Sequence, residues 1–177
     1  MIKAIMGVKE QVLRIKSKPV IKIDKKISTL IRDLKDTLTT QKDPEGVGLA
    51  APQIGKNVRV FVIMPTPKSL RVFVNPEIVS ISEEKNMPKN SAGKKIMEGC
   101  LSLPHYYGPL RRSQEIRIKY LDSFGKEQTE TLKGLDAQII QHECDHLEGI
   151  LFIDRLIEQK TPLYEYINGE WEKVELL

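Results

Sequence analysis

One segment towards the C-terminal end of the chain must form a helix with two different faces. Over residues 135–148, at about 100° per residue, the apolar side chains gather on one side: Ala137, Ile140, Cys144 and Leu147. That stripe must face a core, and Gly149 is well placed to end the helix. His142 and His146 lie on the other side, four residues apart, so both imidazoles can reach one cation.

Glu143 and two apolar residues accompany the histidines. Glu143 follows the first histidine in "QHECDHLEG" (141–149), beside a bound metal but outside its ligands, which is where a general base would take a proton from metal-bound water. Leu135 and Ile139 project to the same side as the histidines, so we expect a pocket there that suits an apolar substrate group. The spacing alone leaves two interpretations equally open, a catalytic site and a coincidence on a solvated helix face.

A third metal ligand has to come from another part of the chain. A catalytic site of the zinc type has three protein ligands and an open position for water. Only His105 remains as a further histidine, and Cys100 in "MEGCLSLP" (97–104) is the better candidate. The alternative role for a cysteine is that of a small buried thiol. Cys144 fits that role, because it belongs to the apolar stripe of the helix.

A glycine-rich segment, "EGVGLAAPQIG" (45–55), offers a second set of candidate residues. It lacks the Lys-Ser/Thr pair of a phosphate loop and the spacing of a dinucleotide fingerprint, so a nucleotide site is not expected. Small residues let another backbone approach closely. Gln53 carries an amide donor that suits an oxyanion.

The length and composition predict one compact domain over residues 1–177, with 40% hydrophobic and 29% charged residues. A formal net charge of +4 without a block of like charges predicts no specific nucleic-acid partner. The first residues show no secretory signal, and the apolar run "VRVFVIM" (58–64) is far too short to span a membrane. The lack of a spanning run predicts no membrane partner, and the count of only two cysteines is typical of a cytoplasmic protein.

The remaining elements predict an α+β fold. Residues 27–39 have apolar side chains at helical spacing and predict an amphipathic helix. Segments rich in β-branched residues predict three strands, at 58–64, 71–74 and 78–81. Residues 82–95 predict an exposed loop, and "EIRIKYLDSFGKEQTETL" (115–132) predicts an antiparallel hairpin. The expected architecture has antiparallel strands packed around a central C-terminal metal-binding helix, with an N-terminal amphipathic helix.

Three segments together resemble the signature of the peptide deformylase family, and they occur in the family's order. They are "GVGLAAPQ" (46–53), "EGCLS" (98–102) and "QHECDH" (141–146). The resemblance covers most of the chain and includes "NPEI", "LDSFG" and "HLEGILFIDRL". Three separate motifs in order are much more specific than one His-Glu-x-x-His pentapeptide.

The resemblance implies an activity and a role for each site residue. The family removes the formyl group from the N-terminal formyl-methionine of new bacterial or organellar polypeptides and releases formate, by attack of metal-bound water. Cys100, His142 and His146 would bind the metal, and Glu143 would be the general acid/base. Gln53 and the backbone N–H of Leu101 would stabilise the oxyanion. We expect the methionine side chain of the substrate to enter a pocket formed by Val47, Leu135 and Ile139. The backbone of Gly46, Val47 and Gly48 would accept the peptide as an added strand.

The resemblance also implies a cofactor and partners. One divalent metal ion per chain is expected, with ferrous iron in the cell, although zinc, nickel and cobalt suit the same thiolate and imidazole donors. The partners are formyl-methionyl peptides of nascent chains, and a transient ribosome association stays open. The tail at 159–177 is acidic at its end and lacks a basic helix, so it does not predict docking onto ribosomal RNA.

Some positions depart from the family's usual pattern. Gly7 stands where a proline is expected, and Gln138 occupies a site that often holds arginine. In "HYYGPLRRS" (105–113), Arg112 takes the arginine position. Two rival functions remain: a His-Glu-x-x-His endopeptidase, whose third ligand usually lies downstream, and a metal-binding homologue without turnover. No histidine follows residue 146, so Cys100 is the residue that discriminates against the endopeptidase.

Overall fold

The computed structural model describes residues 1–90 and 92–175. Its helices are α1 (Lys25–Thr39), α2 (Gly134–Leu147) and α3 (Phe152–Gln159), with short 3-10 turns η1 (Gln11–Arg14) and η2 (Ala51–Ile54). Its strands are β1 (Gly48–Ala50), β2 (Val60–Ile63), β3 (Arg71–Ile81), β4 (Lys85–Asn86), β5 (Glu98–Cys100), β6 (Leu103–Gly108), β7 (Arg112–Ser113), β8 (Glu115–Leu121), β9 (Glu127–Lys133), β10 (Leu163–Ile167) and β11 (Glu170–Val174). The expected combination of helices with antiparallel strands is confirmed.

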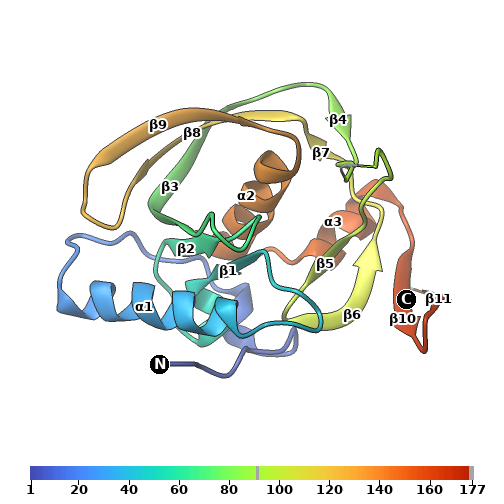
Figure 1. The fold of residues 1–177 in the computed structure, drawn as a ribbon, viewed down its shortest axis with the longest axis horizontal. Helices are drawn as coiled ribbons and strands as arrows, with labels where there is room; N and C mark the ends of the chain where they lie inside the picture. Colours follow the sequence, from blue (N-terminus) through green and yellow to red (C-terminus); the bar gives the residue numbers. More distant parts are fainter. Residues whose placement is uncertain (91, 176–177) are drawn as a thin grey trace.

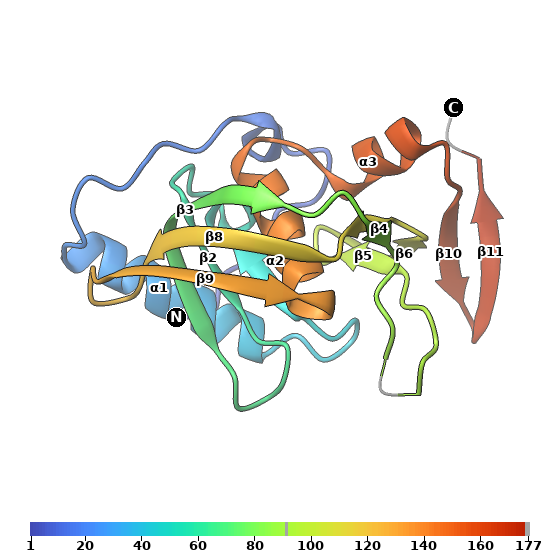
Figure 2. The same cartoon turned by 90° about the horizontal axis from the view of Figure 1, so that it is seen from above.

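The strands form three antiparallel sheets. The largest has the order β1-β2-β3-β8-β9, a second has the order β11-β10-β6-β5, and β4 pairs with β7. Helix α2 lies in the middle of the molecule, against β1, β2, β8 and β9 (Figure 1). Seen from above, the four-stranded sheet lies at one end, with β10 and β11 outermost (Figure 2). The central helix therefore lies where the two larger sheets meet.

Strand β2 explains why the helices lie on opposite faces of the large sheet. Its side chains alternate, so Val60 and Val62 pack with the buried face of α1, while Phe61 and Ile63 pack with α2. A strand covered on both faces is apolar at every position. The run "VFVI" thus contributes two residues to each of two hydrophobic clusters. The apolar stripe of α2 packs against the sheet in the second of them.

Helix α1 begins two residues before the expected 27–39. The reason is Asp24, whose Oδ1 accepts hydrogen bonds from the backbone N–H of Lys26 at 2.9 Å and of Ile27 at 3.0 Å. This side chain satisfies two of the helix's free N–H groups and so stabilises a helix start at Lys25.

The prediction of separate strands at 71–74 and 78–81 was wrong. Both belong to β3, which keeps pairing with β8 through register shifts between Val74 and Glu77 and between Ile78 and Ser80. Asn75, with a φ of 49°, and Pro76 lie in the first of these irregularities. A β-bulge tolerates a proline that regular pairing would exclude, so the strand continues past it.

The 82–95 segment is not a simple loop. Residues Lys85–Asn86 form β4, and Lys89 bridges to Lys95, while Ser91 lies outside the described residues. The expected hairpin is confirmed as β8 and β9. In its turn, Asp122 Oδ1 accepts from the backbone N–H of Phe124 and of Lys126, which fixes the reversal.

Helix α2 ends at Leu147, and Gly149, the expected terminating residue, follows two residues later with a φ of 76°. A Cβ there would also come within 2.6 Å of the carbonyl oxygen of Arg14, so two separate constraints favour glycine. Of the expected core stripe, three members are fully buried and Cys144 is half-buried against the same cluster. No helix in the described ranges is long and apolar enough to cross a membrane.

Candidate metal centre and catalytic pocket

Two elements bring three metal-ligating side chains together. Cys100 lies at the end of β5, and His142 and His146 lie one turn apart on α2. The candidate ligand atoms of these three buried residues lie within 4.8 Å of one another, and Cys100 Sγ is 3.2 Å from His146 Nε2. One sulfur and two imidazole nitrogens are a donor set for a divalent transition metal. The residues that the sequence nominated as ligands therefore fit one ion.

The electrostatics favour the ligating form of Cys100. Burial alone raises the pKa of its thiol, but the charge of His146 and hydrogen bonds with both histidines outweigh burial and hold the pKa well below its usual value. A thiolate, rather than a thiol, binds metal. Cys144 has the opposite environment, because burial raises the pKa of its thiol to about 12. The two cysteines therefore have the different characters expected of a ligand and of a core residue.

Glu98 orients His142, a role that sequence analysis did not assign. Its Oε1 lies 2.7 Å from His142 Nδ1, so the other ring nitrogen is left for the metal centre. Gln138 Nε2 donates to Glu98 Oε2 at 2.9 Å. The available sequence signal was the position of Glu98 two residues before Cys100, since alternate residues of a strand share a face.

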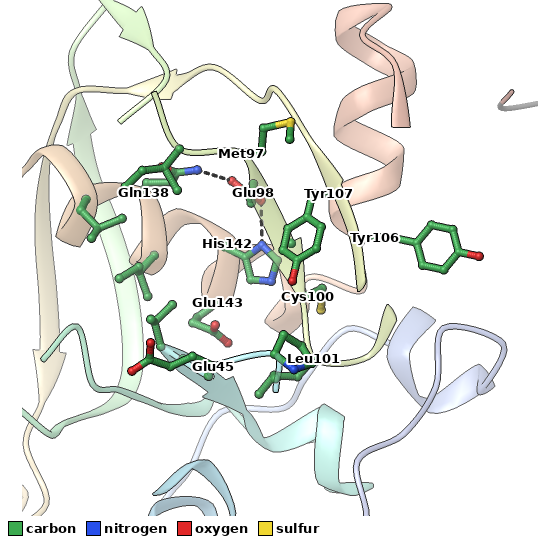
Figure 3. Close-up of a pocket in the computed structure, with 18 of the residues that line it drawn as sticks. Glu45, Met97, Glu98, Cys100, Leu101, Tyr106, Tyr107, Gln138, His142 and Glu143 are labelled. Carbon is green, nitrogen blue, oxygen red and sulfur yellow. Dashed lines mark hydrogen bonds and ion pairs between the residues drawn. The ribbon is translucent and has the colours of Figure 1, made fainter. Parts of the chain in front are cut away.

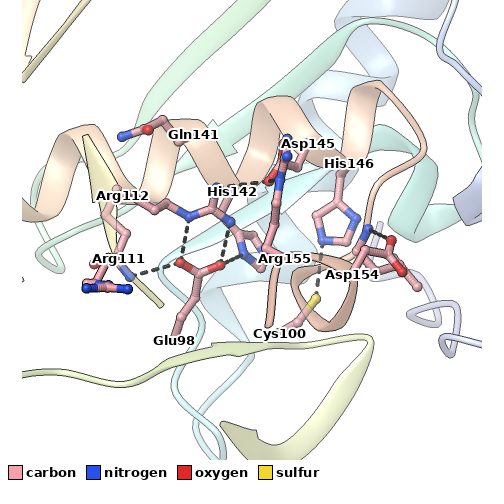
Figure 4. A network of polar contacts seen from close by, with 12 residues as sticks. Glu98, Cys100, Arg111, Arg112, Gln141, His142, Asp145, His146, Asp154 and Arg155 are labelled. Carbon is pink, nitrogen blue, oxygen red and sulfur yellow. Dashed lines mark hydrogen bonds and ion pairs between the residues drawn. The ribbon is translucent and has the colours of Figure 1, made fainter. Parts of the chain in front are cut away.

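Arg112 holds Glu98 in place. Its Nε and Nη2 donate to the two carboxylate oxygens of Glu98 at 2.7 and 2.6 Å (Figure 4). Burial alone raises the pKa of Glu98, but the charge and hydrogen bonds of Arg112 outweigh it and keep the pKa well below its usual value. Arg112 Nη1 also donates to Asp145 at 2.9 Å, and Arg155 of α3 donates to the same carboxylate. This network, buried except at Arg155, joins β5, β7, α2 and α3 next to the metal centre.

Glu143 has a free carboxylate oxygen beside the centre. The side chain is buried, and its Oε2 has no hydrogen-bond partner among the described residues. Burial raises the pKa of Glu143 to about 7. A Cβ at Gly48 would overlap this carboxylate, so the glycine makes the room that Glu143 occupies. A carboxyl group placed in this way can take up and return a proton.

Gln53 faces the centre from η2. Its Oε1 accepts from the backbone N–H of Ala50 at 2.8 Å, which fixes the amide. Its Nε2 therefore points the other way, 3.5 Å from Cys100 Sγ and 3.2 Å from Ser102 Oγ. A donor is thus directed at the space beside the sulfur.

A cavity of about 380 Å³ opens onto these groups (Figure 3). The structure places ten of the eleven nominated site residues in its lining: Gly46, Val47, Gly48, Gln53, Cys100, Leu101, Leu135, Ile139, His142 and Glu143. The eleventh, His146, contacts the sulfur of Cys100 through its Nε2. His105 and Tyr107 also line the cavity. Leu135 and Ile139 give it an apolar wall on the histidine side of α2, as their helical positions predicted.

Comparisons with known proteins point to one family. The family model for polypeptide deformylase matches residues 2–162. A curated peptide deformylase of Pseudothermotoga lettingae is 43% identical over 154 residues, which cover 87% of this chain and 82% of that protein. One of Dictyoglomus turgidum is 40% identical over 161 residues, covering 91% and 97%.

Solved structures give the same result. A peptide deformylase from Thermotoga maritima superposes with a TM-score of 0.78 at 36% identity, covering 88% of this chain and 97% of that one. One from Legionella pneumophila has a TM-score of 0.75 at 42% identity, covering 88% and 86%. By sequence and by structure, the chain belongs to the peptide deformylase family.

Proposed function

We propose that the chain removes the formyl group from the N-terminal formyl-methionine of newly made polypeptides and releases formate. The observation that carries the proposal is the meeting, in one cavity, of three metal-ligating side chains and the unpartnered carboxylate oxygen of Glu143. When bound, a divalent cation held by Cys100, His142 and His146 supplies Lewis-acid activation of water and of the formyl carbonyl. Ferrous iron is our proposal for the cell, and zinc, nickel and cobalt suit the same donors.

The chain's own residues manage the proton and the developing negative charge. Glu143 takes a proton from the attacking water at its free oxygen and returns it to the departing amine. Negative charge develops on the formyl oxygen as the carbonyl is attacked. Gln53 Nε2 and the backbone N–H of Leu101 stabilise that charge by hydrogen bonds. The fixed amide of Gln53, held by Ala50, supports its part in this proposal.

The lining of the same cavity supports the proposed substrate. Val47, Leu135 and Ile139 form an apolar lining that receives the methionine side chain. Strand β1 is the edge of the five-stranded sheet, so the backbone around Gly46 and Gly48 can pair with the substrate as an added strand. Formyl-methionyl peptides are therefore the proposed partners, and a transient contact with the ribosome would bring the enzyme to them.

The direct test is formate release from formyl-Met-Ala-Ser by protein loaded anaerobically with iron or nickel. We expect formate in equal amount to the new free N-terminus, and none after the metal is removed by a chelator. Acetyl-Met-Ala-Ser is the matched control, because it differs by one methyl group on the acyl carbon; its hydrolysis would give acetate and a free N-terminus, so the free N-terminus is the readout for both peptides. Stoichiometric metal without formate would support a metal-binding homologue without turnover. Cleavage of internal peptide bonds would support the endopeptidase.

Replacing Gly48 by Ala should lower kcat for formate release by about 100-fold, because the new Cβ displaces the carboxylate of Glu143. Steady-state kinetics on formyl-Met-Ala-Ser measure the loss, and circular dichroism checks the fold. Gly7→Ala is the control, since no atom lies within 4 Å of its new Cβ. Unchanged kcat in Gly48→Ala would mean that the position of Glu143 does not limit the reaction.

A further inference from the structure

The C-terminal hairpin of β10 and β11 lies beyond the residues that the family model matches and joins the sheet that carries Cys100. The match covers residues 2–162, and β10 begins at Leu163. Strand β10 pairs with β6, with Tyr164 opposite Tyr107, and β6 pairs with β5. Figure 2 shows the hairpin as the outer edge of that sheet. One continuous sheet therefore runs from the metal centre to the hairpin.

One face of this sheet is aromatic. Residues opposite one another in an antiparallel pair share a face, so Tyr107, Tyr164, Tyr166 and Trp171 lie on the same side. The rings of Tyr107 and Trp171 meet edge to face at 5.4 Å, and those of Tyr166 and Trp171 lie 4.7 Å apart. We call Tyr107, Trp171 and Tyr166 the aromatic strip.

The aromatic strip is continuous with the catalytic cavity. Tyr107 lines the cavity together with its neighbour Tyr106 (Figure 3). Gly99 of β5 leaves room for the ring of Tyr107, because a Cβ there would come within 2.6 Å of Tyr107 Cδ1. The outer members are open to solvent, with Tyr166 41% and Trp171 49% exposed. A surface of exposed aromatic side chains next to a cavity is a candidate binding surface.

The charge of the hairpin argues for a peptide rather than a nucleic acid as the occupant. Its residues 163–175 carry four glutamates and one lysine: Glu165, Glu170, Glu172, Glu175 and Lys173. Phosphate backbones bind basic surfaces, so this segment does not suit RNA. A polypeptide whose first residue occupies the cavity must leave it along one wall, and Tyr107 is part of the wall that continues onto the hairpin.

We infer that the aromatic strip binds the third to fifth residues of the polypeptide substrate and favours an aromatic side chain there. This rests on the proposed function, because it requires a formyl-methionyl peptide in the cavity. An extended chain advances about 3.3 Å per residue, so each ring spacing along the strip spans between one and two residues. Edge-to-face and offset contacts add stabilisation beyond the burial of apolar area.

The test compares formyl-Met-Ala-Ala-Ala-Ala with three peptides that carry Phe at the third, fourth or fifth position. For the parent, Phe at one or more of these positions should raise kcat/KM about 2- to 10-fold, the range of an aromatic contact. In Trp171→Ala and in Tyr166→Ala, the ratio between Phe and Ala peptides should fall towards about 1. Phe124→Ala is the matched control, because Phe124 is 92% exposed in the β8–β9 turn and should leave the ratio unchanged.

A second measurement does not depend on turnover. Trp171 is the only tryptophan of the chain, so its fluorescence reports on the strip. In the Glu143→Ala variant, the Phe-containing peptide should change this fluorescence at lower concentration than the Ala peptide. If the ratio of kcat/KM between Phe and Ala peptides were the same in the parent and in both strip variants, with formate still released, the aromatic strip would not bind the substrate. The proposed function would then still stand. A concentration-dependent mass that Trp171→Ala abolishes would assign the strip to a second copy of the chain instead. No formate from any of the peptides would overturn both.

Discussion

Replacing Glu143 by Gln should lower kcat for formate release by about 10²- to 10⁴-fold, the contribution of a general acid/base. The substitution keeps the size of the side chain, so the room beside Gly48 stays filled and the cavity keeps its shape. What is lost is the carboxylate oxygen that has no partner within the described residues. An amide cannot take a proton from water and hand it to the departing amine.

The metal content should distinguish this loss from damage to the centre. Glu143 is not among the three clustered ligand residues, so the variant should bind the same amount of metal as the parent. Glu148→Gln is the matched control at the end of the same helix, where Glu148 pairs with Lys16 and Arg59. Its kcat should stay close to that of the parent. Full turnover by Glu143→Gln would show that another group carries the proton.

The half of the metal centre that lies on α2 could be predicted from local spacing. His142, Glu143 and His146 lie within five consecutive residues, and 3.6-residue periodicity places them relative to the apolar stripe. Cys100 is 42 residues before His142, so no periodicity relates the two. Its nomination needed chemical reasoning on the ligand number and the order of three motifs. The place of Cys100 in space was known only from the structure, in which its strand β5 pairs with β6.

The supporting network could not be predicted, because its contacts cross between elements. Arg112, Glu98, Asp145 and Arg155 come from β7, β5, α2 and α3, and charged residues in a sequence are usually taken to be solvated. The two-residue strand β7, which carries Arg112, was not predicted either. Short elements such as β7 have too few residues to show a period of two, whereas β8 and β9, with seven each, were recognised.

The C-terminal part was missed for a related reason. Helix α3 buries only Phe152 and Leu156, and four of the five residues of β11 are exposed. A hairpin that gains its stability by adding to the edge of β6 needs no strong amphipathic pattern of its own. The segment "LYEYINGEWEKV" does alternate, and its Asn-Gly turn is a hairpin signal that could have identified it.

The second large effect is expected at Arg112, where we predict that Arg112→Met lowers the free energy of unfolding by about 3–5 kcal/mol. The guanidinium is buried and pairs with the buried carboxylates of Glu98 and Asp145. Methionine fills part of the volume of the arginine side chain. It leaves Glu98 with His142 as its one remaining ion-pair partner among the described residues. Removing one partner of a buried ion pair costs more than the pair itself contributes, since the remaining charge stays desolvated. Urea unfolding of the metal-free proteins measures the difference.

Arg155→Met is the control that separates the effect of a buried ion pair from the effect of removing one positive charge. Arg155 also pairs with Asp145, but its side chain is 33% exposed, and Asp145 would keep Arg112. We therefore expect a loss of no more than about 1 kcal/mol, the range of partly exposed ion pairs.

The two variants should also differ in metal affinity. Without Arg112, Glu98 loses the two hydrogen bonds that aim it at His142, and loss of such a supporting contact weakens metal binding about 10- to 100-fold. Equal stability and equal metal affinity in the two variants would mean that Arg112 neither stabilises the core nor positions the ligand.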